Sequence, residues 1–483
     1  MKEFPKNDTL FNANSFDCMT IRYSASWLNS AQTTIHSDTR TGEILNASIL
    51  INANMISVQY ADRIGATVAI DPRVRTTVFP QEIQGELIQA AIAQAVGTGL
   101  GLTMNWGASC AYPVDSLRSA SFTQKYGLAS SVMGGVIIND VATEEDVRNG
   151  VCLVNTKPGP YDELVIKYLY QPIYASSLQE EKETLDSWIR EHTGDPYYAY
   201  IRNQSRFDSD PRNSRGSLGD DHLKSFDYML PNVRKGFENY YSWFAKEDRD
   251  FLMRRRVHSA LSERLSGRIY AILSYIGGIY LNDIREKDAI PSYSMVDREK
   301  QKAALSKALE LAKNLDWVDD TAHLNEFEIS DKKADRLRLD IFNGIFGRLP
   351  YVEVCTERFP DAAYTASEYL DDIYGIVWEG VLKHRPLENF ERALQTAFLE
   401  SIISTSTATA PIGSFKASKT GFAATGKPEI NLAALRNGGK VDMKMYSLQN
   451  AEEVAGFSSI PPIYTNQTKI AAYYFDLLMR TKD

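Results

Sequence analysis

The sequence predicts an α+β protein, in which a first domain of mixed strands and helices is followed by a large, mainly helical region. Short segments before residue 55 alternate apolar and polar residues, as strands do. From residue 81 the apolar residues recur at helical steps, and beyond residue 176 long charged segments with helical periodicity dominate. Hydrophobic residues make up 43% of the chain and charged residues 24%, a composition that can bury ordinary cores.

Two neighbouring strands are expected near the N-terminus. The segment DCMTIRYSASW (17–27) alternates apolar and polar residues, and EILNASILIN (43–52) is rich in residues that favour strands. The turn-forming cluster SDTRTGE (37–43) leads directly into the second segment. The following DPRVRTTVFPQE (71–82) is expected to be a loop.

A helix is predicted from about Gln81 to Leu102, because apolar residues fall there at three- and four-residue steps: Ile83, Leu87, Ile88, Ala91 and Ala95. Each glycine inside a helix costs roughly 1 kcal/mol relative to alanine. The end of this helix nevertheless carries three of them, at positions 97, 99 and 101. We expect the helix to stop near Asn105 and Gly107, which are suitable C-cap residues.

Beyond the first domain, the sequence predicts two mainly helical regions. The sequence is irregular beyond Cys110 and becomes helical and charged after Ser176, most clearly at 176–192 and 298–315. A small, polar stretch at 404–429 is predicted to be a long loop or hairpin. We therefore divide the chain into a first α+β domain, a helical region, and a helical C-terminal region with a long polar loop, over residues 1–175, 176–345 and 346–483.

Charge and cysteine content exclude several classes of function. The formal net charge of −9 argues against a nucleic acid or an anionic membrane as partner, since both attract a basic face. No stretch reaches the roughly 18 apolar residues of a membrane span. The four cysteines never form a Cys-x-x-Cys pair, so neither a zinc ribbon nor a thioredoxin-type site is supported. Whether the four cysteines form one or two disulfides is left open, because sequence alone does not show which cysteines would pair.

The stretch IAQAVGTGLGLTMNWGAS (92–109) can be compared with the helix of a zinc protease. In the signature His-Glu-x-x-His-x-x-Gly-x-x-His, three histidines bind zinc and the glutamate is the general base. The glycine allows the chain to turn back toward the metal. When that glycine is placed at Gly101, the four chemical positions are occupied by Gln94, Ala95, Thr98 and Met104. Only the glycine and the apolar frame of the signature remain.

Neighbouring motifs extend this comparison. Asn105, Ala108 and Ser109 match a His-Asn-x-x-Ala-Ser run, and Met133 matches the methionine of a Met-turn. In the helical half, DPRNSRGSLGDD (210–221) resembles a segment of the same proteins. Gly134 stands where an aspartate follows the Met-turn methionine. Together these motifs resemble the metzincin-like family of zinc-dependent metalloproteases that bacteria export, often as lipoproteins.

The resemblance covers most of the chain and implies a zincin-type protease domain followed by a mainly helical region. It implies that the protease domain is N-terminally incomplete, because the start of the chain matches the interior of that domain. It also implies export to the periplasm or the outer-membrane surface of a Gram-negative bacterium. Membrane association would then depend on an N-terminal anchor outside this sequence. The oligomeric state is not indicated.

The residues at the four chemical positions indicate lost catalysis. A glutamine amide and a threonine hydroxyl are poor zinc ligands, and a methionine thioether suits softer metals. Without zinc, the pKa of water stays near ~15.7, and Ala95 offers no base to accept its proton. We therefore expect a pseudopeptidase without zinc or another cofactor that binds a peptide or a partner protein. Strand 43–52 is expected to offer the sheet edge for an extended peptide.

Two alternatives remain open at this stage: an active hydrolase with a non-standard site, and a structural subunit of an envelope complex. For the first, Ser109, Cys110 and Ser116 lie near the altered signature, but no histidine is placed to activate them. None of the six histidines are four residues apart, and His36 alone is expected near the site.

A loop between the helices suggests a possible cation site. Its carboxylates are Asp208, Asp210, Asp220 and Asp221, and calcium binds such oxygen ligands. The order of residues does not follow the EF-hand pattern. The alternative interpretation is a loop of Asx turns and helix caps, in which GDD opens a helix at His222.

Overall fold

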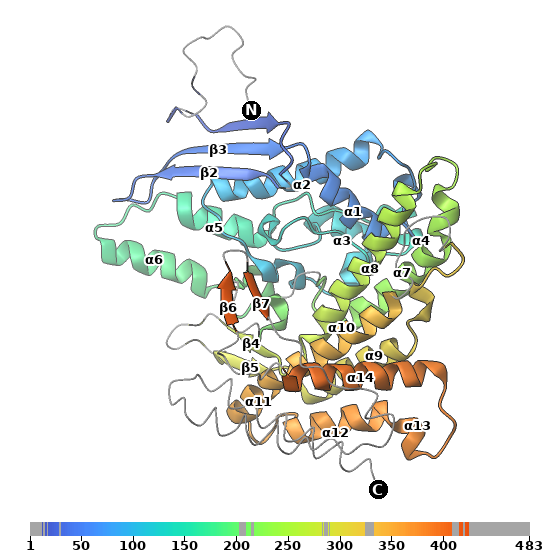
Figure 1. Ribbon diagram of the computed structural model, residues 1–483. Coiled ribbons are helices and arrows are strands. Elements are labelled where there is room, and N and C mark those ends of the chain that lie inside the picture. The colour runs from blue at the N-terminus through green and yellow to red at the C-terminus, as the bar shows by residue number, and fades with distance from the viewer. Residues whose placement is uncertain are drawn as a thin grey trace.

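The computed structural model describes most of the chain, namely residues 18–28, 30–201, 209–213, 217–282, 290–323, 333–407, 415–418 and 421–424 with a few single residues besides. Figure 1 shows the N-terminal sheet at one end of the molecule and a layered set of helices at the other. The mixture of small sheets with a large helical region confirms the predicted α+β class.

The N-terminal sheet has three strands in the order β1-β3-β2. They are β1 (Thr20–Ser24), β2 (Gln32–Ser37) and β3 (Ile44–Asn52). The predicted neighbours β1 and β3 pair in parallel, while β2 pairs with β3 antiparallel and was not predicted. The expectation that strand 43–52 offers a sheet edge is wrong, because β3 is bonded on both sides. The edges belong to β1 and β2.

Helix α2 (Gln81–Gly99) packs across this sheet and beside α1 (Met55–Thr67). Its Ala91 and Ala95 contact Ile49 and Ile51 of β3 in one apolar cluster. Small side chains and glycine let the helix approach closely: a Cβ atom on Gly99 would lie 3.4 Å from the Cβ of Ala47. The sequence prediction of this helix is thereby confirmed over most of its length.

The predicted end of α2 is wrong. The helix ends at Gly99, and Gly101 has a φ of +89°, a left-handed conformation that glycine adopts at little cost. Asn105 and Gly107 were expected to cap the helix, but they lie beyond the chain reversal. They form tertiary contacts instead.

Between α2 and the helical region, the chain forms short elements and two longer helices. These are η2 (Trp106–Cys110), η3 (Val114–Arg118), α3 (Ala120–Tyr126), η4 (Val132–Gly134), α4 (Glu144–Arg148), α5 (Pro160–Tyr170) and α6 (Leu178–Arg190). The irregular stretch predicted beyond Cys110 is therefore built mainly from single turns. Helix α6 corresponds to the predicted helical segment 176–192.

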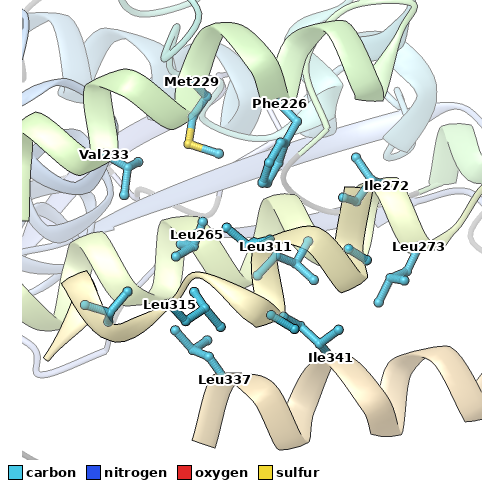
Figure 2. Packing of buried hydrophobic residues seen from close by; sticks show 14 of the residues in the cluster. Phe226, Met229, Val233, Leu265, Ile272, Leu273, Leu311, Leu315, Leu337 and Ile341 are labelled. Carbon is cyan, nitrogen blue, oxygen red and sulfur yellow. The ribbon is translucent and has the colours of Figure 1, made fainter. Parts of the chain in front are cut away.

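The helical region surrounds one continuous apolar core. Its helices are α7 (His222–Phe244), α8 (Leu252–Leu273), α9 (Arg298–Lys313), α10 (Lys333–Gly347), α11 (Leu349–Arg358), α12 (Ala366–Val377), α13 (Glu379–Leu382) and α14 (Asn389–Thr407). Figure 2 shows Phe226 and Met229 of α7 above Leu265 of α8, with Leu311 and Ile341 on the opposite side. The same core includes Ile64 of α1 and Phe398 of α14, so it extends across the proposed domain boundaries, which remain predictions.

A buried ion cluster joins the first domain to α8. The carboxylate of Asp140 is fully buried and accepts hydrogen bonds from Arg264 (Nε, 2.6 Å) and Arg268 (Nε, 2.8 Å). Burial alone would raise the pKa of Asp140, but the two guanidinium groups outweigh it and hold the pKa below its usual range. Asn232 of α7 donates to the carbonyl oxygen of Asp140 at 3.0 Å. The helical region is thus attached to the residues that follow η4 (Val132–Gly134).

Two short hairpins lie outside the N-terminal sheet. Strands β4 (Ile279–Leu281) and β5 (Tyr293–Met295) form one hairpin, and β6 (Phe415–Ser418) and β7 (Gly421–Ala424) form another. The second hairpin lies within the predicted polar stretch 404–429, whose first residues belong to α14.

All four cysteines are free thiols. Within the described residues, no helix combines the length and apolar character needed to cross a membrane.

Candidate active site

The chain reversal after α2 forms the centre of the candidate site. The N–H of Leu100 donates to the carbonyl of Val96 (2.9 Å), and the N–H of Leu102 reaches back to Gly97 (3.0 Å). Between them, Gly101 adopts its left-handed conformation, where a Cβ atom would also lie 3.3 Å from Ile44 Cδ1. The reversal directs the following residues back along the last turns of the helix. We call Gln94, Ala95, Thr98, Gly101 and Met104 the α2 site.

Two side chains of the α2 site contact each other. The Nε2 amide of Gln94 donates to the sulfur of Met104 over 3.1 Å, although the residues are ten positions apart. The hydroxyl of Thr98 donates to the backbone carbonyl of Gln94 at 3.2 Å. These three side chains therefore satisfy one another or the backbone of their own helix. None of them supplies an imidazole nitrogen or a carboxylate, the usual ligands of catalytic zinc.

Ala95, which the sequence comparison aligns with the general base, lies in an apolar environment. Its side chain is buried beside Ile49, Ile51 and Met55. Its carbonyl oxygen accepts a hydrogen bond from the hydroxyl of Thr33 in β2 at 3.1 Å. The edge strand β2 is thereby attached to α2 at this residue. No group at this position takes up a proton.

Met133 packs directly beneath α2. Its side chain is fully buried, and a Cβ atom on Gly97 would lie only 2.6 Å from its sulfur. Its carbonyl oxygen accepts a hydrogen bond from the N–H of Asn105 at 3.1 Å. Gly134 follows in a crowded position, where a Cβ atom would meet Ile137 Cδ1 at 3.0 Å. The absence of a side chain at positions 97 and 134 therefore fits the close packing of this turn.

Asp162, which sequence analysis missed, holds the Met133 turn in place. Its buried carboxylate accepts hydrogen bonds from Ser131 Oγ (2.5 Å), Val132 N (2.9 Å) and Gly159 N (2.9 Å). A weak sequence signal exists, because GPYD places an aspartate in the first turn of α5, where it caps the helix. Its hydrogen bonds with Ser131 and Val132, which hold the turn, become visible only in the tertiary structure.

Asn105 and Gly107 bind the segment that precedes the helical region. The Asn105 side chain donates to the carbonyl of Ala199 (2.9 Å) and accepts from the N–H of Ile201 (3.1 Å). A Cβ atom on Gly107 would lie 2.1 Å from Ile201 Cγ1. Next to this contact, the hydroxyl groups of Thr103 and Tyr200 are 3.3 Å apart. The α2 site therefore adjoins a segment nearly one hundred residues further along the chain.

The nucleophile candidates do not form a catalytic arrangement. Burial raises the pKa of the Cys110 thiol, which keeps it protonated and therefore poorly nucleophilic. Its sulfur is 3.1 Å from the hydroxyl of Ser217, and Ser109 Oγ is 3.3 Å from that same hydroxyl. Ser116 lies in η3, where its carbonyl accepts from Ser119 N. The contacts of Ser109 and Cys110 with Ser217 join η2 to the loop before α7.

Three of the histidines lie on β2, α7 and α8. His36 lies on β2, exposed and opposite Asn46 in the sheet register. His222 and His258 are buried in α7 and α8, where their Nε2 atoms contact the carbonyl oxygens of Pro211 (3.0 Å) and Val318 (3.1 Å). Among the described residues, no group of three or more histidine, cysteine, aspartate or glutamate side chains is arranged to hold a metal ion.

The carboxylates of the proposed cation loop bind protein donors. Asp210 pairs with Arg212 at 2.7 Å, and Asp220 accepts from the N–H of Val114 at 3.1 Å. Asp221 caps α7 and pairs with Lys300 at 3.0 Å. Asp208 lies outside the described residues. These contacts match the interpretation as turns and helix caps, while cation binding stays a prediction.

A sequence profile of the Met-zincin family matches residues 76–385, which include the whole of α2 and the Met133 turn. The chain belongs to the Met-zincin family. The resemblance deduced from the motifs around Gly101 is thereby confirmed, as is the zincin type of fold. Neither the curated proteins nor the solved structures contain a match. The match continues from α2 through α13, so the Met-zincin family includes much of the helical region as well.

Proposed function

We propose that this Met-zincin is a peptidase homologue without zinc-dependent catalysis, which binds an extended peptide or a strand of a partner protein beside α2. The observation that carries the first half is the contact between Gln94 and Met104 at 3.1 Å. In a zinc peptidase of this type, the first and third metal ligands occupy these two positions. Here the amide N–H of Gln94 is directed at the sulfur, so the pair is held together without an ion.

The chemistry of peptide hydrolysis supports the same conclusion. Zinc lowers the pKa of its bound water from ~15.7 to about 7, and a carboxylate beside the first ligand accepts the proton. The α2 site offers neither a strong ligand set nor that carboxylate, since Ala95 is buried against β3. Two independent requirements are missing, so a single compensating residue would not restore the reaction.

The sheet edge supports a binding role. Strand β2 is an edge strand whose residues are mostly exposed, and Thr33 attaches it to α2 at Ala95. An extended peptide can add to such an edge through main-chain hydrogen bonds. Ile35, one of the exposed apolar residues of the protein, would contact the side chains of that peptide. A location at the bacterial cell envelope, inferred from the resemblance to exported proteins, is part of this proposal.

Metal analysis and a peptidase assay on the purified chain test the first half. We expect no stoichiometric zinc and no cleavage of denatured casein or of a mixed fluorogenic peptide library. Stoichiometric zinc together with cleavage that EDTA abolishes would overturn the proposal in favour of an active peptidase.

An array of extended peptides tests the second half. We expect selected peptides to bind the wild type, and Ile35→Lys to weaken them by about tenfold, because it places a charge at the sheet edge. Tyr293→Lys is the matched control, since Tyr293 is similarly exposed on another strand, β5. No binding, or equal binding by both variants, would favour a purely structural subunit.

A further inference from the structure

Helices α5 and α6 present an apolar surface that the core does not use. The exposed fraction is 49% for Tyr170, 98% for Tyr174 and 84% for Leu178, and Tyr168 and Leu169 are also exposed. All five lie between residues 168 and 178, at the end of α5, in the connection after it and at the start of α6. Such a concentration of large exposed apolar side chains is typical of a binding surface.

Helix α6 has the sequence pattern of a helix that buries one face. Leu178, Leu185, Trp188 and Ile189 follow one another at helical steps, and charged residues occupy much of the remainder. Nevertheless, none of its residues is fully buried. Figure 1 shows α6 at the outer edge of the molecule, beside α5 and away from the layered helices. Its amphipathic pattern is therefore only partly explained by its contacts within this chain.

The α5–α6 pair is firmly attached and therefore suited to binding a partner without rearrangement. The hydroxyl of Tyr170 donates to the carbonyl of Leu100 at 2.8 Å, directly at the end of α2. Nζ of Lys167 lies 4.4 Å from the ring centre of Trp188 and connects the two helices. Ser177 caps α6 by accepting a hydrogen bond from Glu180 N.

The charges around this surface indicate the kind of partner. The segment 176–192 contains five carboxylates but only two cationic side chains, and the whole chain carries a net charge of −9. At helical steps, Glu181 lies within the apolar stripe, between Leu185 and Trp188, and Asp186 lies farther around the helix from Ile189. A partner helix that carries lysine or arginine along its apolar stripe would complement both features.

We propose that the surface formed by Tyr168, Leu169, Tyr170, Tyr174 and Leu178 with the apolar stripe of α6 binds a basic amphipathic helix of a partner protein. The exposed tyrosines and Trp188 supply the large, rigid side chains that dominate the energy of such contacts. Glu181 within the stripe and the net negative charge of the segment 176–192 select for positive charge. This surface lies on α5 and α6, whereas the sheet edge at Ile35 lies on β2, and different variants test the two binding roles.

The experiment uses the full chain and a labelled peptide in which leucine and lysine follow a helical pattern. A peptide with the same leucines but glutamate in place of lysine is the charge control. We expect the lysine peptide to bind with a micromolar Kd, measured by fluorescence anisotropy, and the glutamate peptide not to bind. The double variant Tyr174→Ser, Leu178→Ser should weaken binding about tenfold or more.

A second double variant, Val381→Ser with Leu382→Ser, is the matched control, because these residues are exposed on α13. It should bind like the wild type. A third variant, Glu181→Lys with Asp186→Lys, should reverse the preference toward the glutamate peptide. Circular dichroism melting verifies that each variant is folded.

Three results would overturn the proposal. The first is equal binding of the lysine peptide by the Tyr174→Ser, Leu178→Ser variant. The second is self-association in sedimentation velocity that this variant abolishes, which would assign the surface to a second copy of the chain. The third is binding to vesicles of anionic lipid with the same dependence on the variant, which would assign it to a membrane. If only Ile35→Lys loses binding of extended peptides, the proposal for the α5–α6 surface is unaffected, because that variant tests the sheet edge of β2.

Discussion

The side-chain amide of Gln94 and the sulfur of Met104 are 3.1 Å apart, although a chain reversal and ten sequence positions separate the two residues. The reversal depends on Gly101, whose φ of +89° directs the chain back along α2. The reversal thus brings the side chain of Met104 back to that of Gln94 on α2. The site can therefore be tested by changing side chains alone.

Restoring the zinc ligands is the first test. The variant carrying Gln94→His, Ala95→Glu, Thr98→His and Met104→His should bind one zinc ion, because positions 94 and 98 are one helical turn apart and the reversal brings position 104 to them. Plasma mass spectrometry after dialysis measures the metal. The single variant Gln94→His is the control and should bind none. If the quadruple variant is folded but free of zinc, the proposed alignment with the zincin signature is wrong.

The close contact between α2 and the Met133 turn gives the second test. Gly97→Ala should lower the free energy of unfolding by about 1–3 kcal/mol, because the new Cβ atom would lie 2.6 Å from the buried Met133 sulfur. Gly85→Ala is the matched control in the same helix. Gly85 has nothing within 4 Å of the added atom, so alanine should stabilise the helix by roughly 0.5–1 kcal/mol. Urea unfolding measures both changes.

A double-mutant cycle identifies the cause of this effect. In a Met133→Ala background the sulfur is absent, so the penalty of Gly97→Ala should largely disappear. If the penalty persists there, it does not arise from the contact with Met133.

The carboxylate of Asp162 gives the third test. Asp162→Asn replaces an acceptor of three hydrogen bonds by a group that donates on one side, and should cost roughly 2 kcal/mol of unfolding free energy. Glu163→Gln makes the same chemical change at the next, exposed residue and should cost less than about 0.5 kcal/mol. Equal effects of the two substitutions in urea unfolding would contradict the assignment of Asp162 to the Met133 turn.

Sequence reasoning succeeded where the signal is local. The spacing around Gly101 and the position of Met133 identified the family, and the periodicity from residue 81 identified α2. It placed the end of this helix too late, because Asn105 resembles a C-cap residue but uses its side chain to bind Ala199 and Ile201 instead. Nothing close to Asn105 in sequence reveals partners nearly one hundred residues away.

The sheet edge illustrates a second limit. The strand β2 has six residues, most of them polar or exposed. It therefore lacks both the apolar alternation that identified β1 and the run of strand-favouring residues that identified β3. Its pairing with β3 decides which strand is central, and that property depends on tertiary structure. Consequently the sequence analysis expects a sheet edge at residues 43–52, whereas the edges are β1 (Thr20–Ser24) and β2 (Gln32–Ser37). Asp162 was missed for a similar reason, since its local cap conceals its contact with Ser131.

The buried His222 gives the fourth test, which concerns pH. Burial lowers the pKa of His222 from 6.5 to about 4 in the folded protein. The unfolded chain therefore takes up a proton near pH 6.5 while the folded protein does not, so stability is complete above that pH and decreases as the pH falls toward 4. At about 1.4 kcal/mol for each pH unit, this shift corresponds to a loss of roughly 3 kcal/mol.

The variant His222→Gln isolates this contribution, because it cannot be protonated. Its unfolding free energy should depend much less on pH between 6.5 and 4 than that of the wild type, measured in urea at several pH values. His258, whose pKa burial also lowers, retains its smaller effect in both proteins. Carboxylates with a lowered pKa, such as Asp140 and Glu379, contribute below about pH 5, where the unfolded chain begins to protonate them, and they do so equally in both proteins. An unchanged slope in His222→Gln would show that another group causes the acid sensitivity.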